Sequence, residues 1–217
     1  MKSNLIAKLV LASSLAVSLA CSEGLFVGPT ATYNFKQDTK GTLEIPLNAM
    51  SIVNNNGGLK TTENKYGIGL KFGYDFDLWR VYTAFIYDSG GEESRDNTAG
   101  SMAVNTDSSD FLLGIDWTPN FSEQFKMLTG IMLGASKHTT DISLSISSLT
   151  YETQINQTGF VYGLRLGGIY GFNEHNEVEF GFEIKEAKYS DKYTTNFNIV
   201  NLKRTTAGMF IGYSYKF

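Results

Sequence analysis

The end of the chain, residues 205–217, constrains the fold most strongly because its apolar residues fall on every second position. The intervening residues are mostly small or polar, such as Gly208 and Ser214. A period of two residues predicts a β-strand whose two faces meet different environments. In a water-soluble protein, such a strand would leave an unprotected apolar edge. The apolar positions are Ala207, Met209, Ile211, Tyr213, Tyr215 and Phe217.

The same alternation occurs in seven earlier segments, so eight strands are predicted. It is clearest at 65–76, where Tyr66, Ile68 and Leu70 alternate with glycine and lysine. In several segments the second face carries Lys, Arg, Asp or Glu, which are costly to bury in an apolar core. The seven earlier segments are 24–35, 65–76, 78–89, 108–119, 124–137, 158–172 and 176–189.

These patterns predict an all-β protein: a transmembrane antiparallel up-and-down β-barrel with eight strands, apolar outside and charged inside. Aromatic residues lie near both ends of the apolar faces and aliphatic residues lie between them, as the two interfaces of a bilayer require. The connections alternate between short and long. Short periplasmic turns and long external loops are typical of outer-membrane barrels. The predicted long loops are 36–64, 90–107, 138–157 and 190–203.

Two of the predicted loops have apolar patterns of their own. In the first loop, Leu43, Ile45, Leu47, Met50, Ile52 and Val53 either fold back over the barrel mouth or bind a partner. In the third loop, the alternation of Ile142, Leu144 and Ile146 predicts that the fifth and sixth strands extend as a hairpin. External loops on a rigid scaffold are the expected place for binding to a host molecule or another surface.

The N-terminus predicts export. Residues 1–20 read as a removed signal peptide, with Lys2 and Lys8 before a short apolar stretch and a small-residue cleavage site. The mature barrel domain is then 21–217, and losing two lysines changes its net charge from −4 to −6. This acidity argues against nucleic acid as a partner. Cys21 would become the first mature residue, either as a lipidation site or as an incidental residue near the cleavage point.

The chain resembles the small outer-membrane barrels of the OmpA and opacity-protein type from about Gly24 to Phe217. The sharpest match is the terminal signal formed by Met209, Ile211, Tyr213, Tyr215 and Phe217. The resemblance implies that the barrel-assembly machinery reads this signal. It also implies a place in the outer membrane of a Gram-negative bacterium, among membrane lipid and lipopolysaccharide. The peptidoglycan-binding domain of larger relatives is not expected.

Charged residues on the inward face predict a network inside the barrel. Counting back from the short turns places Arg165 beside Glu183, Asp116 beside Lys126, and Asp75 near Arg80. An eight-stranded interior holds little more than side chains, so a salt-bridged plug is expected. The alternative is a narrow polar passage for small or hydrophobic solutes. The predicted network is Lys71, Asp75, Arg80, Asp116, Lys126, Arg165, Glu179 and Glu183.

Catalysis is the least expected role. Ser136 and His138 share a strand face and Asp141 follows, but this spacing is a weak match to a Ser–His–acid arrangement. His175 falls in a predicted periplasmic turn. The sequence contains no recognisable zinc, calcium or nucleotide motif, so no cofactor is expected. The expected role is therefore structural and surface-interactive, with a pore as the alternative and a lipid-A-modifying enzyme third.

Overall fold

The computed structural model describes residues 24–44, 58–89, 92–97, 100–146, 149–193 and 198–217. The predicted signal peptide, Cys21 and most of the apolar cluster of the first loop lie outside these residues. Within the described ranges nearly all residues are in strands, and no helix is long and apolar enough to cross a membrane.

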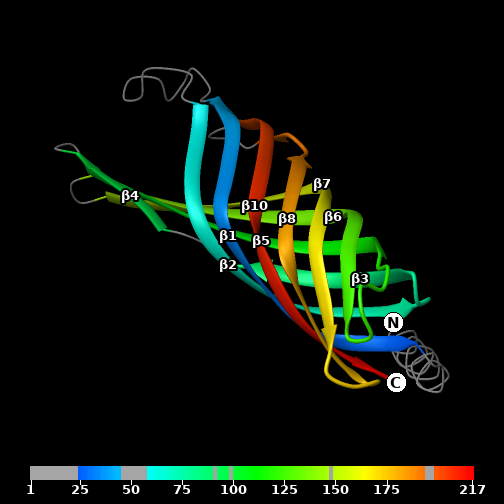
Figure 1. The fold of residues 1–217 in the computed structure, drawn as a ribbon. Coiled ribbons are helices and arrows are strands. Elements are labelled where there is room, and N and C mark those ends of the chain that lie inside the picture. The colour runs from blue at the N-terminus through cyan, green and yellow to red at the C-terminus, as the bar shows by residue number, and fades with distance from the viewer. Residues whose placement is uncertain (1–23, 45–57, 90–91, 98–99, 147–148, 194–197) are drawn as a thin grey trace, which may run out of the picture.

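Eight long strands form a closed antiparallel barrel, which confirms the predicted fold (Figure 1). Each strand pairs with the preceding barrel strand, and the first pairs with the last to close the wall. Two short strands, β4 (Glu92–Asn97) and β9 (Lys192–Tyr193), add to β5 and β10. The barrel strands are β1 (Leu25–Glu44), β2 (Gly58–Asp75), β3 (Trp79–Asp88), β5 (Gly100–Trp117), β6 (Phe125–Ile146), β7 (Leu149–Gly171), β8 (Asn176–Tyr189) and β10 (Asn198–Lys216).

The outward faces carry the apolar bands that a bilayer requires. One row across β5, β6, β7 and β8 is entirely aliphatic, and its side chains are 45–63% exposed. It lies between an upper row containing Phe111 and Phe160 and a lower one containing Phe125 and Tyr170. Aromatic side chains above and below an aliphatic band mark the two interfaces. The aliphatic row is Ile115, Ile131, Leu164 and Ile184.

Above the upper aromatic row, the outward side chains become polar while the strands continue. Phe111, Ala135 and Phe160 form one row, and Ser109, Lys137 and Thr158 form the next. The hairpin of β6 and β7 then runs to Ile146 and Leu149, as predicted for the third loop. The ten residues of β6 from 137 to 146 span about 33 Å along the strand at about 3.3 Å per residue.

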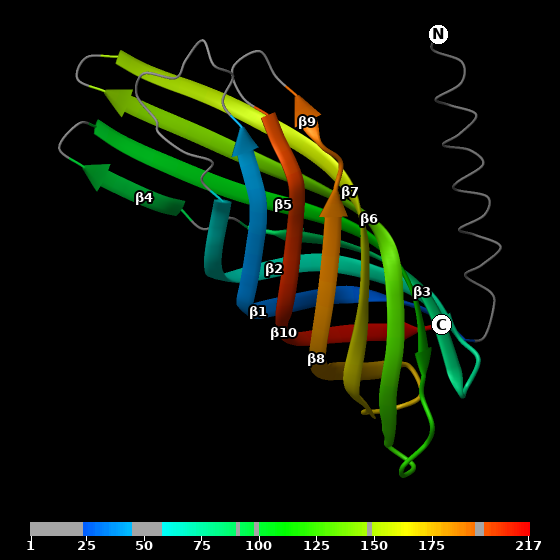
Figure 2. The ribbon, with the colours of Figure 1, turned by 90° about the horizontal axis from the view of Figure 1, so that it is seen from above.

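The barrel wall divides in two above the membrane. β3 ends at Asp88 and β8 ends at Tyr189, whereas the strands on either side of them continue. β1, β2 and β10 therefore curve away from β5, β6 and β7, as Figures 1 and 2 show. The outer parts of β5, β6 and β7, together with β4, are called the projecting sheet below. This sheet comprises β4 and residues 100–109, 137–146 and 149–158.

Inward glycines make room for the large side chains of the interior. A Cβ atom at Gly114 would lie 2.1 Å from Cζ of Tyr82, which is buried between the cationic ends of Lys71 and Arg165. Tyr82 therefore has no space to move aside, and glycine is the residue that fits at position 114.

Replacing Gly114 with alanine is expected to lower the free energy of unfolding by about 1–3 kcal/mol, the usual cost of overpacking. The matched control is Gly171→Ala, where the nearest atom to the new methyl group is 3.8 Å away. Denaturant unfolding of the protein refolded in detergent measures both variants. Equal effects would contradict the close fit around Tyr82.

Candidate functional site in the barrel interior and at the outer rim

The lowest layer of charges in the interior is centred on Arg80. Its buried guanidinium donates to Asp75 Oδ2 at 2.8 Å and also to the carboxylate of Glu177. Lys216 Nζ lies 3.0 Å from Asp75 Oδ2, and Lys126 Nζ lies 3.8 Å from it. Two carboxylates are thus held among three cations near the short turns.

The middle layer combines ion pairs with aromatic rings. Lys71 donates to Glu179, and Arg165 Nη2 lies 3.3 Å from Glu179 Oε2. Arg165 Nε is 3.6 Å from Asp116 Oδ1. The Arg165 guanidinium lies 4.1 Å from the centre of the Phe210 ring, a cation–π geometry. These side chains fill the lumen at the level of the aliphatic band.

The upper layer is built around Asp110, which is fully buried. Arg204 Nη2 donates to its two oxygens at 2.7 and 2.8 Å, and Ser136 Oγ donates to Oδ1 at 2.6 Å. Lys185 Nζ lies 3.7 Å from Asp110 Oδ2 and 3.0 Å from Glu183 Oε1. The layer therefore joins β5, β6, β8 and β10.

Polar and apolar side chains close the space above the upper layer. Lys65 Nζ donates to the backbone oxygen of Thr106 at 2.8 Å, which links β2 to β5 where β3 has ended. Ile155 from β7 and Leu202 from β10 are both buried, although β8 no longer separates their strands there. The outer end of the lumen is thus filled by side chains of both parts of the wall.

The structure places the predicted network residues as follows. Asp75 pairs with Arg80 across β2 and β3, and Arg165 lies opposite Glu183 across β7 and β8, as expected from the turns. The side chain of Arg165 nevertheless points to Glu179 and Asp116, while Glu183 binds Lys185.

The predicted pairing of Asp116 with Lys126 is wrong. Asp116 lies opposite Gly130, and Lys126 instead bridges to Asn120 and approaches Asp77 at 3.5 Å. The partner of Asp116 is thus four residues later than expected, and the centre of the connection moves from residue 121 to residue 123. Phe121 donates its backbone N–H to Phe125 O at 2.9 Å, so the chain turns later than residues 119–123 indicate.

Within the described ranges, six further charged residues join the network through ion pairs. Arg204 is the largest omission, since the final strand was expected to begin at Thr205 and the fourth loop to end at 203. Its position two residues before inward-facing Thr206 is the signal that could have identified it. The others continue the same alternation on their own strands. The six are Asp88, Asp110, Glu177, Lys185, Arg204 and Lys216.

Ser136 and His138 do not form a catalytic arrangement with Asp141. Ser136 and His138 are buried in the lumen, whereas Asp141 lies on the opposite face of β6. The Ser136 hydroxyl is bonded to Asp110 and to Tyr189. Burial lowers the pKa of His138 to about 3, and the positive charges of Arg204 and Lys65 act in the same direction. His138 is therefore neutral near pH 7.

No group of three or more His, Cys, Asp or Glu residues in the described part of the chain is arranged to hold a metal ion. His175, in the turn between β7 and β8, contacts Lys216 O through Nδ1 at 3.0 Å and stacks on Tyr215. It lies at the end of the barrel with the short turns, as predicted.

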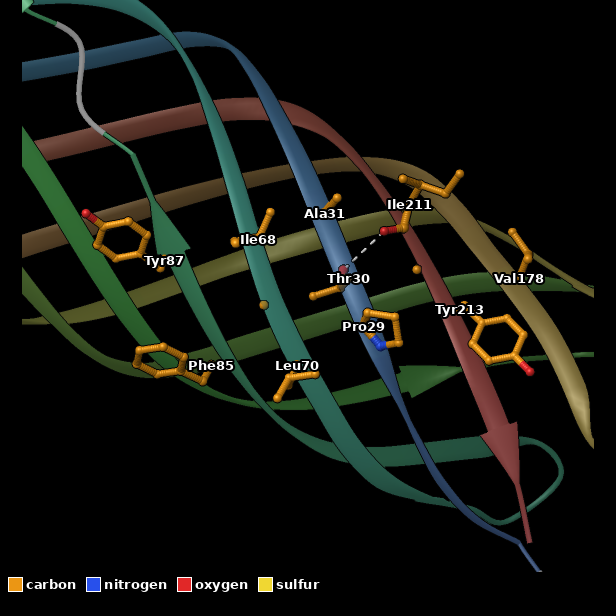
Figure 3. Close-up of a pocket in the computed structure, with 12 residues that line it drawn as sticks. Pro29, Thr30, Ala31, Ile68, Leu70, Phe85, Tyr87, Val178, Ile211 and Tyr213 are labelled. Atoms are coloured by element: carbon orange, nitrogen blue, oxygen red, sulfur yellow. Dashed lines mark hydrogen bonds between the residues drawn. The ribbon is translucent and has the colours of Figure 1, made fainter.

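A groove on the outside of the barrel follows β1, where Pro29 and Ala31 are small outward residues (Figure 3). Ile68 and Leu70 flank it on one side, and Ile211 lies on the other. Thr30 Oγ1 donates to Ile211 O at 3.3 Å beneath it. The groove belongs to the apolar outer wall, so in a bilayer it faces acyl chains.

The final strand completes the barrel. The Phe217 backbone N–H donates to Leu25 O at 2.9 Å, so the last residue takes part in closing the wall. Tyr215 and Phe217 form an edge-on aromatic pair with ring centres 5.2 Å apart. All five residues of the predicted assembly signal point outward and are 40–57% exposed: Met209, Ile211, Tyr213, Tyr215 and Phe217.

A closed eight-stranded barrel with an apolar outer band, two aromatic girdles and a charged interior defines an integral outer-membrane β-barrel protein. Its place is the bacterial outer membrane. The chain belongs to the family described as Helicobacter outer membrane protein, whose family model matches residues 55–217.

The chain is similar to solved structures of outer-membrane proteins at low sequence identity. OprG from Pseudomonas aeruginosa is 16% identical, with a TM-score of 0.50, over 90% of this chain and 96% of that chain. Ail, the attachment invasion locus protein of Yersinia pestis, is 15% identical, with a TM-score of 0.46, over 89% and 99%. A comparison with curated protein sequences found no match.

Proposed function

We propose that this protein is a closed outer-membrane barrel with a structural and surface-interaction role, in which the projecting sheet contacts molecules or surfaces outside the cell. Barrel-assembly machinery, membrane lipid and lipopolysaccharide are its proposed partners in the envelope. A host molecule or another surface is the proposed partner outside. The observation that carries the proposal is the filling of the lumen by buried ion pairs.

The ion pairs cross the lumen rather than lining it. Arg204 and Asp110 come from β10 and β5, which are on opposite sides of the barrel order. Arg80 and Glu177 come from β3 and β8, which are also opposite. A side-chain bridge between opposite walls occupies the path that a solute would take. These pairs therefore support a closed barrel over a narrow pore.

The purified wild-type protein is expected to show no conductance steps in planar lipid bilayers. Replacing both Arg204 and Asp110 with serine removes one cross-lumen bridge and is expected to produce small steps. The control exchanges Lys188 and Glu186, a pair 3.8 Å apart on the outward face of β8, for serine. Regular steps in the wild-type protein would contradict the closed barrel and favour the narrow pore.

Shortening the projecting sheet tests the surface role. Asp141 and Gln154 lie opposite each other, so residues 141–154 can be replaced by an Asn-Gly turn that keeps the remaining register. Cells that display this variant are expected to attach to host cells or to coated surfaces at least tenfold less than wild-type cells. Gel mobility with and without heating checks that the barrel is folded. Unchanged attachment of folded, displayed variant would overturn the proposed role.

The expectation that the chain is not an enzyme stays a prediction. Unchanged lipid A mass on overexpression is the result expected for a protein without lipid-A-modifying activity.

A further inference from the structure

The projecting sheet has an open edge along β7. The pairing of β7 with β8 ends where Ser190 N donates to Thr158 O at 3.0 Å. β7 continues back to Leu149 paired with β6, and among the described residues no strand pairs with its other side. Figure 2 shows this end of β7 running beyond β8. About nine residues of a long strand therefore have one free side.

The backbone groups that face this edge follow from two hydrogen bonds. Gly171 N donates to Gln124 O at the foot of β6, so odd-numbered residues of β7 turn their N–H and C=O groups toward β6. Thr158 bonds toward β8, so even-numbered residues turn theirs to the other side. The pairing of β6 with β7 has no register shift between these points. Gln154 and Asn156 therefore direct donors and acceptors at the open edge.

Most exposed edges in natural sheets carry features that prevent further pairing, such as charges, prolines, bulges or covering segments. The segment 149–158 has one charged residue, Glu152, and no proline, glycine or lysine. Threonine, tyrosine and isoleucine, which favour strands, make up half of it.

The other open edges of this outer region are different. β4 (Glu92–Asn97) has the sequence EESRDN, in which four of six residues are charged. The free stretch of β2, residues 58–65, contains Lys60, Glu63 and Lys65. β7 is thus the described edge of this region with the fewest features that oppose strand addition.

We infer that residues 149–157 of β7 form a docking edge that binds an extended segment of another polypeptide by adding it to the projecting sheet as a further antiparallel strand. In this mode, main-chain hydrogen bonds supply the affinity, and side chains on either face supply the specificity. The single negative charge of the edge favours a segment that is neutral or basic. The inference rests on the proposed surface role and names the class of partner and the way it binds.

A matched pair of substitutions at one position tests this edge. Gln154→Pro removes the side chain and the N–H that faces the edge, while the bonds to β6, made by odd-numbered residues, remain. Gln154→Ala removes the same side chain and keeps the N–H. The probe is a labelled ten-residue peptide of alternating threonine and valine with one lysine. Its binding to the detergent-solubilised full-length protein is followed by fluorescence anisotropy.

The wild-type protein and Gln154→Ala are expected to bind the peptide within threefold of each other, and Gln154→Pro at least tenfold more weakly. Peptide is also expected to slow amide hydrogen exchange at Asn156 of the wild-type protein. Absence of binding to the wild type, or equal binding by all three, would overturn the inference. The inference would also be overturned if the wild-type protein sediments as a dimer and Gln154→Pro as a monomer, since a second copy of the chain would then occupy the edge. If shortening the hairpin abolishes attachment but the wild-type protein does not bind the peptide, the surface role stands and the docking edge is rejected.

Discussion

Replacing Arg204 with alanine is expected to lower the free energy of unfolding by about 3–5 kcal/mol, the largest effect predicted for this protein. The guanidinium donates to both oxygens of Asp110, and both side chains are at most 1% exposed. Without Arg204, Asp110 keeps Ser136 and a lysine 3.7 Å away but loses its two shortest charged contacts. Denaturant unfolding of protein refolded into lipid bilayers measures the change.

The preceding residue supplies a matched control. Lys203 also forms an ion pair from β10, with Nζ 2.7 Å from Glu186 Oε2, but it is exposed on the outside of the barrel. Lys203→Ala is therefore expected to cost about 0–1 kcal/mol, as exposed pairs do. The double variant Arg204→Met with Asp110→Leu is expected to recover much of the loss, because Asp110 is then no longer a buried carboxylate without its arginine. A small effect for Arg204→Ala would show that water enters the upper layer.

Replacing Leu164 with arginine is expected to destabilise the protein by about 2–4 kcal/mol, the cost of an outward arginine near the middle of a bilayer. Leu164 is 63% exposed on the outer wall and lies between Ile131 and Ile184. The same unfolding measurement in bilayers reports the change.

Thr158→Arg is the control for depth on the same face of the same strand. Thr158 lies beyond Phe160 in a polar row beside Lys137, so its replacement is expected to cost about 0–1 kcal/mol. Equal costs at the two positions would place the membrane boundary elsewhere and contradict the assignment of the projecting sheet to the exterior.

The barrel and its two faces were predictable because each lipid-facing strand shows its apolar alternation within a short stretch of sequence. Leu164 and Phe182 point outward and Glu179 and Glu183 point inward, as the alternation indicates. The upper ends of the strands were not predictable in the same way. Thr139 and Asn156 are strand residues that are polar and exposed, so the contrast between the two faces disappears above the membrane. These stretches therefore resembled loops.

The interior network was only partly predictable, since partners in a lumen depend on which strands stand opposite each other. The pair formed by Asp75 and Arg80 follows from the tight turn at Asp77, whose φ of 70° fixes the register. The pair formed by Arg204 and Asp110 joins strands far apart in sequence, and no local pattern indicates it. Asp116 was misplaced because a five-residue connection leaves the centre of its turn undetermined.

The early ends of β3 and β8 have a consequence for how this protein can change over generations. Above them no strand pairing joins the described residues of the two parts of the wall, whereas the bonded cylinder below is continuous. Substitutions and insertions in residues 100–107 or 140–157 are therefore expected to change the projecting sheet at little cost to insertion into the bilayer. The sequence of the projecting sheet can thus diverge while the membrane-spanning wall stays constant.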